Sequence, residues 1–294
     1  MYENLDIAIK EIFGSNTRIE AQQAVSGGDI NDAYHIVLSS GEDVFLKRNE
    51  YAKEDFFAAE AAGLAALSKS GASTPSVIAY GNLKTGGAFL LLEYVRSMSP
   101  KSGYWEALGH MLANMHRAPT GAFVQGGSYG LNSNNYIGQT RQANMPSDSW
   151  LDFFRTARLG AQMKLASHHF DASDRKHCQY LLDHLEEFLP EPEFPSLIHG
   201  DLWGGNVMPD SNGNPMLIDP AVYVGHHEAD IAMTELFGRF SPAFYDAYYE
   251  VIPRESSYAD RRDLYNLYHL LNHLNLFGIS YLSSVRRIIK RYAA

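Results

Sequence analysis

The stretch from His199 to Asp219 constrains the fold and function of this chain more than any other stretch. Three side chains with oxygen atoms follow one another in it at spacings that are typical of a catalytic site. Asp201 and Asn206 lie five residues apart in a loop with apolar flanks. A short hairpin-like segment follows, and a further apolar run ends at Asp219. A carboxylate can accept a proton, and amide and carboxylate oxygens are ligands that Mg²⁺ prefers. The pattern predicts a loop that does chemistry and a second ligand-bearing position after a hairpin.

Each of these residues also has a purely structural interpretation. Asp201 could cap a turn, Asn206 could occupy a left-handed backbone position, and Asp219 before Pro220 could simply end a strand. The surrounding chain must therefore decide between the two interpretations.

The first 95 residues are rich in strand patterns. We expect a helix over residues 3–14, a helix over residues 53–68, and strands over 19–25, 33–38, 44–47, 77–80 and 88–95. We expect Gly27 and Gly28 to form a turn between the first two strands, where backbone amides could approach phosphates. A plain hairpin turn is the alternative.

Lys47 and Glu60 are a candidate ion pair between the third strand and the following helix. Glu60 lies on the apolar stripe that contains Phe56 and Leu64, and a buried carboxylate is costly unless it is paired. A lysine–glutamate pair at these places positions ATP phosphates in kinases. In the alternative, Glu60 lies at the edge of the stripe and reaches water.

The apolar run that ends at Glu93, Tyr94 and Val95 leaves the strand-rich region and enters a helical one. Kinases bind adenine through main-chain groups at such a hinge, so these three residues are candidate nucleotide contacts. The rest of the chain predicts helices over residues 104–117, 150–167, 172–189, 228–238, 242–251, 261–277 and 281–292, with a long loop over 121–145.

This order predicts an α+β fold with two lobes. The small N-terminal lobe, residues 1–95, would hold an antiparallel sheet and one main helix, and the larger C-terminal lobe, residues 96–294, would be mainly helical. We expect the chemistry in the cleft between the lobes. A kinase catalytic loop has the same D-x-x-x-x-N spacing as Asp201 and Asn206, with a metal-binding Asp further on.

Composition excludes several classes of protein. The net charge of −10 disfavours non-specific binding to nucleic acid. Cys178 is the only cysteine, so no intrachain disulfide can form, as is usual in a reducing compartment. The N-terminus lacks the features of a signal peptide, and no apolar run approaches the roughly 20 residues that span a bilayer. We expect a cytoplasmic protein without a membrane partner, whose oligomeric state the sequence leaves open.

The motifs resemble the fructosamine kinase (ketosamine-3-kinase) family, which is related to aminoglycoside and choline kinases and has a protein-kinase-like fold. The resemblance covers nearly the whole chain and rests on Gly27-Gly28-Asp29-Ile30-Asn31, Leu92-Glu93-Tyr94, Asn135-Tyr136-Ile137-Gly138, Trp150, Phe153-Phe154, Arg158-Leu159, His199-Gly200-Asp201-Leu202-Trp203-Gly204-Gly205-Asn206, Ile218-Asp219-Pro220-Ala221, Gly225-His226-His227-Glu228-Ala229-Asp230, Leu236-Phe237-Gly238 and residues 264–278. Trp203 separates the chain from the aminoglycoside kinases.

The resemblance implies a kinase that uses ATP and Mg²⁺ to phosphorylate a hydroxyl, the 3-hydroxyl, of a ketosamine. Ribulosamine, erythrulosamine and fructosamine, free or on a protein amine, are the implied acceptors. By the same resemblance Asp201 accepts the proton, Asn206 and Asp219 hold the metal, and residues 93–95 contact adenine.

Three further residues are candidates for acceptor binding. Trp203 could form an apolar wall against the sugar or wedge the loop against the core. Glu228, with Asp230 beside it, could bind the cationic amine or cap a helix, and we favour capping. His226 precedes them. Asp29, where some family members carry a cysteine, excludes a redox switch at that position, and we expect its carboxylate to face away from the phosphates or to cap a turn.

Three rival functions stay open. A kinase of the aminoglycoside or choline kinase type would act on another amino-alcohol. A nucleotide-binding pseudokinase is disfavoured because Lys47, Glu60, Asp201, Asn206 and Asp219 are all present. A metallohydrolase is suggested by the histidine pairs at 226–227 and at 269 and 273, but the second pair lacks the glutamate of HExxH.

Overall fold

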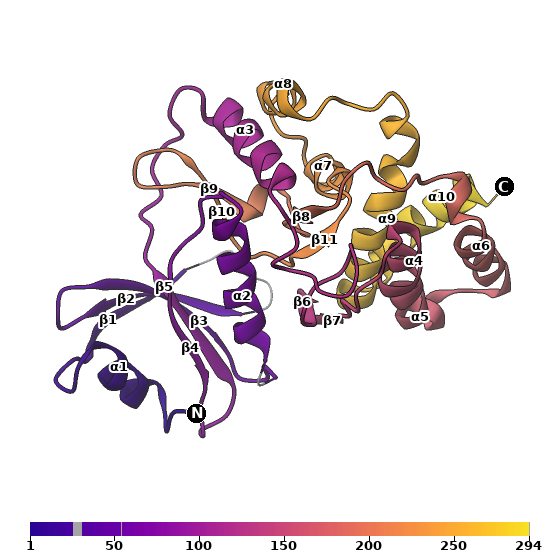
Figure 1. Cartoon of the computed structure of the whole chain (residues 1–294). Helices are drawn as coiled ribbons and strands as arrows, with labels where there is room; N and C mark the ends of the chain where they lie inside the picture. The colour runs from indigo at the N-terminus through magenta and orange to yellow at the C-terminus, as the bar shows by residue number, and fades with distance from the viewer. Residues whose placement is uncertain (26–30, 54, 294) are drawn as a thin grey trace. The chain divides into compact units, whose positions relative to one another are not determined.

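The computed structural model describes residues 1–25, 31–53 and 55–293. The chain forms two compact units (Figure 1). The first contains Met1–Tyr104 and Gly205–Pro220, and the second contains Trp105–Gly204 and Ala221–Ala294. The chain thus returns to its first unit for one short segment, which carries both Asn206 and Asp219.

The first unit is built on an antiparallel sheet of five strands in the order β1-β2-β3-β5-β4. Its elements are α1 (Leu5–Phe13), β1 (Ile19–Ala24), β2 (Asp32–Leu38), β3 (Asp43–Asn49), α2 (Phe56–Lys69), β4 (Val77–Asn82) and β5 (Ala88–Glu93), followed much later by the hairpin β9 (Val207–Pro209) and β10 (Pro215–Leu217). The strands and the two helices predicted for residues 1–95 are confirmed, with ends that differ by a few residues.

The alternation of side chains along β3 determines which face carries chemistry. Leu46 is fully buried in an apolar cluster with Ile9 of α1 and with Phe89 and Leu91 of β5. The next residue, Lys47, points to the opposite face, because successive side chains of a strand alternate. That face is covered by α2, which packs against β4 and β5.

The second unit is mainly helical. Its elements are α3 (Tyr104–Arg117), the hairpin β6 (Asn135–Ile137) and β7 (Thr140–Gln142), α4 (Trp150–Phe153), α5 (Ala161–Leu165), α6 (Ala172–Asp183), the paired strands β8 (Ser196–Ile198) and β11 (Tyr223–Gly225), α7 (Glu228–Thr234), α8 (Pro242–Val251), α9 (Tyr258–Phe277) and α10 (Leu282–Tyr292). The α+β class predicted from the sequence is confirmed.

Two predictions for this unit were wrong in detail. The single helix expected over residues 150–167 is interrupted by a π-helical segment, Phe154–Gly160, between α4 and α5. Within it the guanidinium of Arg158 is fully buried, lies 3.9 Å over the ring of Tyr223 and donates to Ala143 O at 2.7 Å. The expected loop over residues 121–145 contains the hairpin β6–β7, whose three-residue strands are too short to give a periodic pattern.

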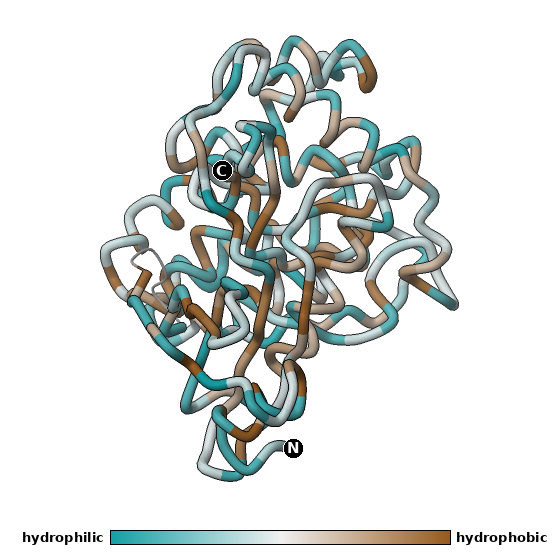
Figure 2. The backbone as a smooth tube through the Cα atoms, turned by 90° about the vertical axis from the view of Figure 1, so that its left-hand side faces the viewer, coloured by the Kyte–Doolittle hydropathy of each residue, from teal (hydrophilic) through white to brown (hydrophobic). Residues whose placement is uncertain are grey.

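Helix α9 forms the centre of the second unit. Leu264, Leu267, Leu271 and Leu274 lie on it without exposed surface and pack in one cluster with Trp150. No helix in the described part of the chain is long and apolar enough to cross a membrane. Along the backbone tube of Figure 2, apolar and polar stretches alternate.

Candidate active site

Lys47 links three elements of the first unit. Its ammonium donates to Glu60 Oε1 of α2 at 2.6 Å and also to Asp219 Oδ1, which follows β10. The side chain of Lys47 is 8% exposed and that of Glu60 13%, so the pair is largely withdrawn from water. Of the two interpretations of Glu60, the structure therefore shows the paired one. The contact of Lys47 with Asp219 joins residues 172 positions apart in the sequence.

The charges of this cluster do not balance, because two carboxylates share one ammonium. Burial alone would lower the pKa of Lys47, but the carboxylates of Asp219 and Glu60 outweigh it and raise that pKa. Burial raises the pKa of Glu60, Lys47 partly offsets this, and the charge of Asp219 adds to it. One negative charge is left over, so the cluster favours a further cation close to Asp219.

The β9–β10 hairpin explains why Asn206 and Asp219 belong together. Leu217 pairs with Val207, and the amide of Ile218 donates to the carbonyl of Asn206 at 3.0 Å. Asn206 therefore lies directly before β9, at the same end of the hairpin where the chain leaves β10 toward Asp219. Asp219 has a φ of 54°, the only positive value of a non-glycine residue in the described chain. Aspartate tolerates this conformation better than most residues, and such backbone outliers cluster at functional sites.

This donor set fits a hard divalent cation. Asn206 offers a neutral amide oxygen and Asp219 a carboxylate, and Mg²⁺ is usually held by one or two carboxylates with water and phosphate oxygens completing its shell. The excess negative charge beside Lys47 points the same way. Asp219 keeps a side-chain exposure of 45%, which leaves the carboxylate accessible.

The structure describes the predicted hinge at residues 93–95 but not the predicted glycine turn at residues 27 and 28. The amide of Glu93 donates to Ser76 O, and its side chain accepts from the amide of Ser76, both at 3.0 Å. The ring of Tyr94 stacks on His35 with 3.7 Å between centroids. A nucleotide contact by the Glu93 main chain would therefore use its carbonyl oxygen. Gly27, Gly28 and Asp29 lie outside the described residues.

Asp201 lies in a loop of the second unit that a buried carboxylate holds in place. Asp230 of α7 is 1% exposed and accepts from the amides of His199 at 2.7 Å and of Gly200 at 2.9 Å. Gly200 has a φ of 80°, and a Cβ there would meet the carbonyl oxygen of Ala221 at 2.2 Å. The loop therefore requires glycine directly before Asp201. The side chain of Asp201 is 26% exposed and can reach solvent or an acceptor.

Behind Asp230 lies a buried chain of polar groups. Asp230 contacts His116 Nε2 at 3.1 Å, His116 Nδ1 contacts the hydroxyl of Tyr248 at 2.8 Å, and that hydroxyl contacts His227 Nδ1 at 3.1 Å. Burial alone would raise the pKa of Asp230, but the hydrogen bond from His116 and the nearby amides lower it. Asp230 is therefore held as an anion that orients the loop.

The capping interpretation of Glu228 and Asp230 was wrong. Helix α7 begins after His227, and no side-chain cap hydrogen bond forms there among the described residues. Sequence reasoning also missed His116, because it lies on α3, 114 positions before Asp230, and no local pattern connects the two.

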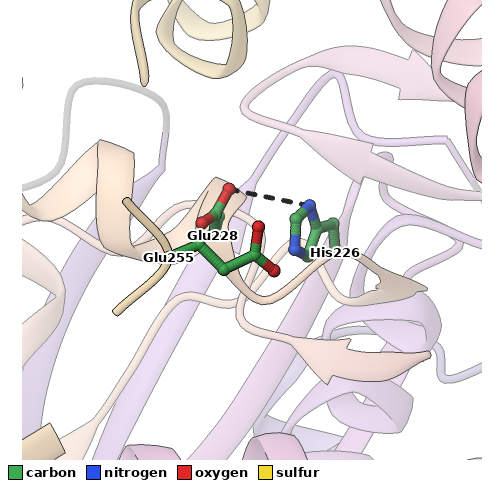
Figure 3. Close-up of side chains that lie close together, drawn as sticks. All are labelled: His226, Glu228 and Glu255. Atoms are coloured by element: carbon green, nitrogen blue, oxygen red, sulfur yellow. Dashed lines mark ion pairs between the residues drawn. The ribbon is translucent and has the colours of Figure 1, made fainter. Parts of the chain in front are cut away.

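Glu228 and His226 are buried in a separate polar cluster (Figure 3). Arg261 donates through Nε and Nη2 to both oxygens of Glu228 and through Nη2 to Glu255 at 2.5 Å. The ring of His226 contacts Tyr265 Oη at 2.6 Å, and burial lowers its pKa strongly. The acceptor role predicted for Glu228 and His226 is not favoured by this burial.

The same cluster disfavours a metallohydrolase. Ligand atoms of His226, Glu228 and Glu255 lie within 4.8 Å of one another, but the guanidinium of Arg261 already donates hydrogen bonds to both carboxylates and so competes with a metal for their oxygens. In the second histidine pair, His273 Nδ1 bonds back to the carbonyl of His269 at 2.8 Å.

Trp203 does not wedge its loop into the core. Its side chain is 40% exposed and meets Phe237 edge-on, with 6.4 Å between ring centroids. An exposed indole two residues from Asp201 can pack on the C–H face of a sugar.

Comparisons with known proteins place the chain in a family. The model of the fructosamine kinase family matches residues 1–294. The protein-ribulosamine 3-kinase of Arabidopsis thaliana chloroplasts is 38% identical over 282 residues, which are 95% of this chain and 84% of that protein. The crystal structure of a candidate fructosamine-3-kinase from Haemophilus somnus superposes with a TM-score of 0.85 at 30% identity and covers 98% of this chain and 96% of that one.

A more distant likeness concerns the fold alone. An aminoglycoside phosphotransferase solved with AMP-PNP and hygromycin B has a TM-score of 0.64 at 16% identity, covering 98% of this chain and 96% of that one. The protein-kinase-like fold expected from the sequence is thereby confirmed. The match of the family model over residues 1–294, together with 38% identity to the protein-ribulosamine 3-kinase of Arabidopsis thaliana, shows that this chain belongs to the fructosamine kinase family.

Proposed function

We propose that this protein transfers the γ-phosphoryl group of ATP to a hydroxyl, the 3-hydroxyl, of a ketosamine such as ribulosamine, erythrulosamine or fructosamine. Membership of the fructosamine kinase family supports the reaction class. The observation that carries the proposal is the bridge from Lys47 to Glu60 and Asp219, because it brings an ammonium for phosphate oxygens next to a carboxylate for a cation.

The first unit supplies the nucleotide contacts in this proposal. Lys47, fixed by Glu60, binds phosphate oxygens, and the main chain of residues 93–95 binds adenine. For Gly27 and Gly28, which lie outside the described residues, the sequence alone suggests a contact with the phosphates. Asn206 and Asp219 hold Mg²⁺. When bound there, Mg²⁺ neutralises charge on the phosphate oxygens and orients them for transfer.

The second unit supplies the acceptor contacts. Asp201 hydrogen-bonds the acceptor hydroxyl and takes its proton as the oxygen–phosphorus bond forms. Asp230, through the amides of His199 and Gly200, keeps the loop in the shape that presents Asp201. Trp203 covers the apolar face of the sugar. We do not propose nucleic acid as a partner, because a net charge of −10 repels the phosphate backbone.

We infer a cytoplasmic location from the single thiol of Cys178, which is buried and has its pKa raised to about 12 by burial and by Asp174. Such a thiol is poorly reactive and has no cysteine partner in the chain.

The test is phosphate transfer from ATP to free fructosyl-lysine and free ribulosyl-lysine, followed by ³¹P NMR of the product. We expect Asp201→Asn to lower kcat by about 10²- to 10⁴-fold, the usual contribution of a general base. Asp152→Asn is the matched control, because Asp152 is an exposed carboxylate of the unit that also carries Asp201 and forms an ion pair with Arg155. Undiminished activity of Asp201→Asn would refute its role as base.

A second arm separates the rival functions. The same assay with an aminoglycoside and with choline tests for another amino-alcohol acceptor. Binding of ATP without transfer to any of these acceptors would favour a pseudokinase, and hydrolysis that depends on zinc would favour the metallohydrolase.

A further inference from the structure

Exposed and half-buried aromatic side chains contact one another in a row on the second unit, starting from Trp203, two residues after Asp201. The ring of Trp203 meets that of Phe237, which is 38% exposed, and Phe237 lies 4.9 Å from His273 between ring centroids. His273 in turn lies 5.3 Å from Phe277 and 5.1 Å from Tyr281. We call these five residues the aromatic strip.

The far end of this strip is the most exposed. Phe277, the last residue of α9, is 47% exposed, and Ile279 beside it is 72% exposed. Exposed apolar side chains gathered in one place mark surfaces that bind a partner. A ketosamine is a single sugar on an amine, so Trp203 alone can cover it. The rest of the strip is therefore free to contact the part of a larger acceptor that lies beyond the sugar.

The strip leads into a basic groove on α10. An open depression of about 490 Å³ is lined by Ile279, Leu282, Ser283, Arg286, Arg287 and Lys290, which we call the basic groove. Helix α10 packs against α6 and α9, and Figure 1 shows it beside them. Ser283, Arg287 and Lys290 are exposed at spacings that place them on one face of the helix.

The charge of the groove differs from that of the chain. Arg286 is neutralised by Asp174 at 2.6 Å and by Asp171 at 3.4 Å. Two carboxylates thus share Arg286, and with Arg287 and Lys290 included these five groups carry one net positive charge, on a chain with a net charge of −10. A local cationic surface on an acidic protein selects an anionic partner.

We propose that the aromatic strip and the basic groove bind the polypeptide around a lysine that carries the ketosamine, with a preference for acidic residues beside that lysine. The sugar lies at Asp201 and Trp203, the lysine stem and neighbouring apolar side chains lie along the strip, and acidic side chains reach Arg287 and Lys290. This inference rests on the proposed function and names the kind of acceptor that the site takes.

The test uses three synthetic peptides of equal length, each with one fructosyl-lysine flanked by glutamates, by serines or by arginines, together with free fructosyl-lysine. We expect kcat/KM of the wild type to fall from the glutamate to the serine to the arginine peptide. The preference should weaken as salt is added, because exposed charges are screened.

Substitutions in the aromatic strip and the basic groove test whether these residues bind the peptide. We expect Arg287→Glu with Lys290→Glu to reverse the preference, by about two- to fivefold for each reversed charge, as exposed ion pairs allow. Phe277→Ser should lower kcat/KM for all three peptides. Each variant should leave kcat/KM for free fructosyl-lysine unchanged. Lys164→Glu is the matched control, since Lys164 is exposed on α5 of the same unit and does not line the groove.

The outcomes separate the two proposals. Transfer to free fructosyl-lysine with no discrimination among the peptides overturns the surface and leaves the proposed function intact. An equal effect of the variants on free and peptide acceptors also overturns it. A concentration-dependent dimer that Phe277→Ser dissociates would show that a second copy of the chain covers the strip instead. Absence of transfer to any acceptor overturns the proposed function and this inference with it.

Discussion

Acidification is expected to destabilise the second unit, because its fold keeps buried histidines neutral. Burial, with a further contribution from His116, lowers the pKa of His227 to about 3, and burial with the neighbouring His273 lowers that of His269 to about 3. In the unfolded chain both side chains have a pKa of 6.5. Between these values the unfolded state binds more protons than the folded state, so the free energy of unfolding falls as the pH falls below about 6.5.

The size of the loss in unfolding free energy follows from how far the pH lies below the pKa of the histidine in the unfolded chain. At pH 5 each histidine contributes a loss of about 2 kcal/mol relative to pH 7.5, since one pKa unit is worth about 1.4 kcal/mol. His227 and His269 together then cost about 4 kcal/mol, which is a large part of the roughly 5–15 kcal/mol that stabilises most proteins. With a urea m-value of about 2 kcal/mol/M, the unfolding midpoint should fall by about 2 M.

The assay is urea unfolding followed by tryptophan fluorescence at pH 7.5, 6.5, 5.5 and 5.0. The three tryptophans, Trp105, Trp150 and Trp203, all lie in the second unit, so their signal reports on the unit that contains the two histidines. Other groups contribute to the total decline, among them His226, whose pKa burial also holds well below its usual value, so variants must isolate the two histidines.

His227→Gln and His269→Gln separate packing from protonation. Each substitution lowers stability at every pH through lost packing, but it also removes a group that titrates. The decline between pH 7.5 and pH 5 should therefore be smaller by about 2 kcal/mol in each variant. A decline as steep as that of the wild type in both variants would refute the assignment of neutral buried histidines.

Three further predictions concern the catalytic machinery. Asp230→Asn removes the anion that holds the amides of His199 and Gly200, and we expect kcat to fall at least tenfold and stability by about 2–5 kcal/mol, measured by steady-state kinetics and urea unfolding. Gly200→Ala places a Cβ against a carbonyl oxygen, so soluble protein should unfold at a clearly lower temperature than Gly204→Ala, where a Cβ has open space. Asn206→Ala should raise the Mg²⁺ concentration needed for half-maximal activity, and EDTA should abolish transfer in both wild type and variant; activity indifferent to EDTA would remove the metal from the proposal.

The sequence predicted the sheet and the main helices because they are periodic. The strands of the first unit, α3 and α8 lie where alternation, helical spacing and flanking proline or glycine indicated them. The break of residues 150–167 into α4, a π-helical segment and α5 could not be predicted in this way, because the burial of Arg158 against Tyr223 is a tertiary contact.

The stretch from His199 to Asp219 shows the same division. Its spacing indicated a proton acceptor at Asp201 and oxygen ligands at Asn206 and Asp219, since these roles depend on residue type and local order. Whether Glu60 was paired with Lys47 or faced water, and whether Glu228 was free or neutralised by Arg261, depended on residues far away in the chain. Local sequence carries propensity and spacing, whereas the partner of a buried charge is chosen by the fold that brings distant residues together, and only the tertiary structure could decide it.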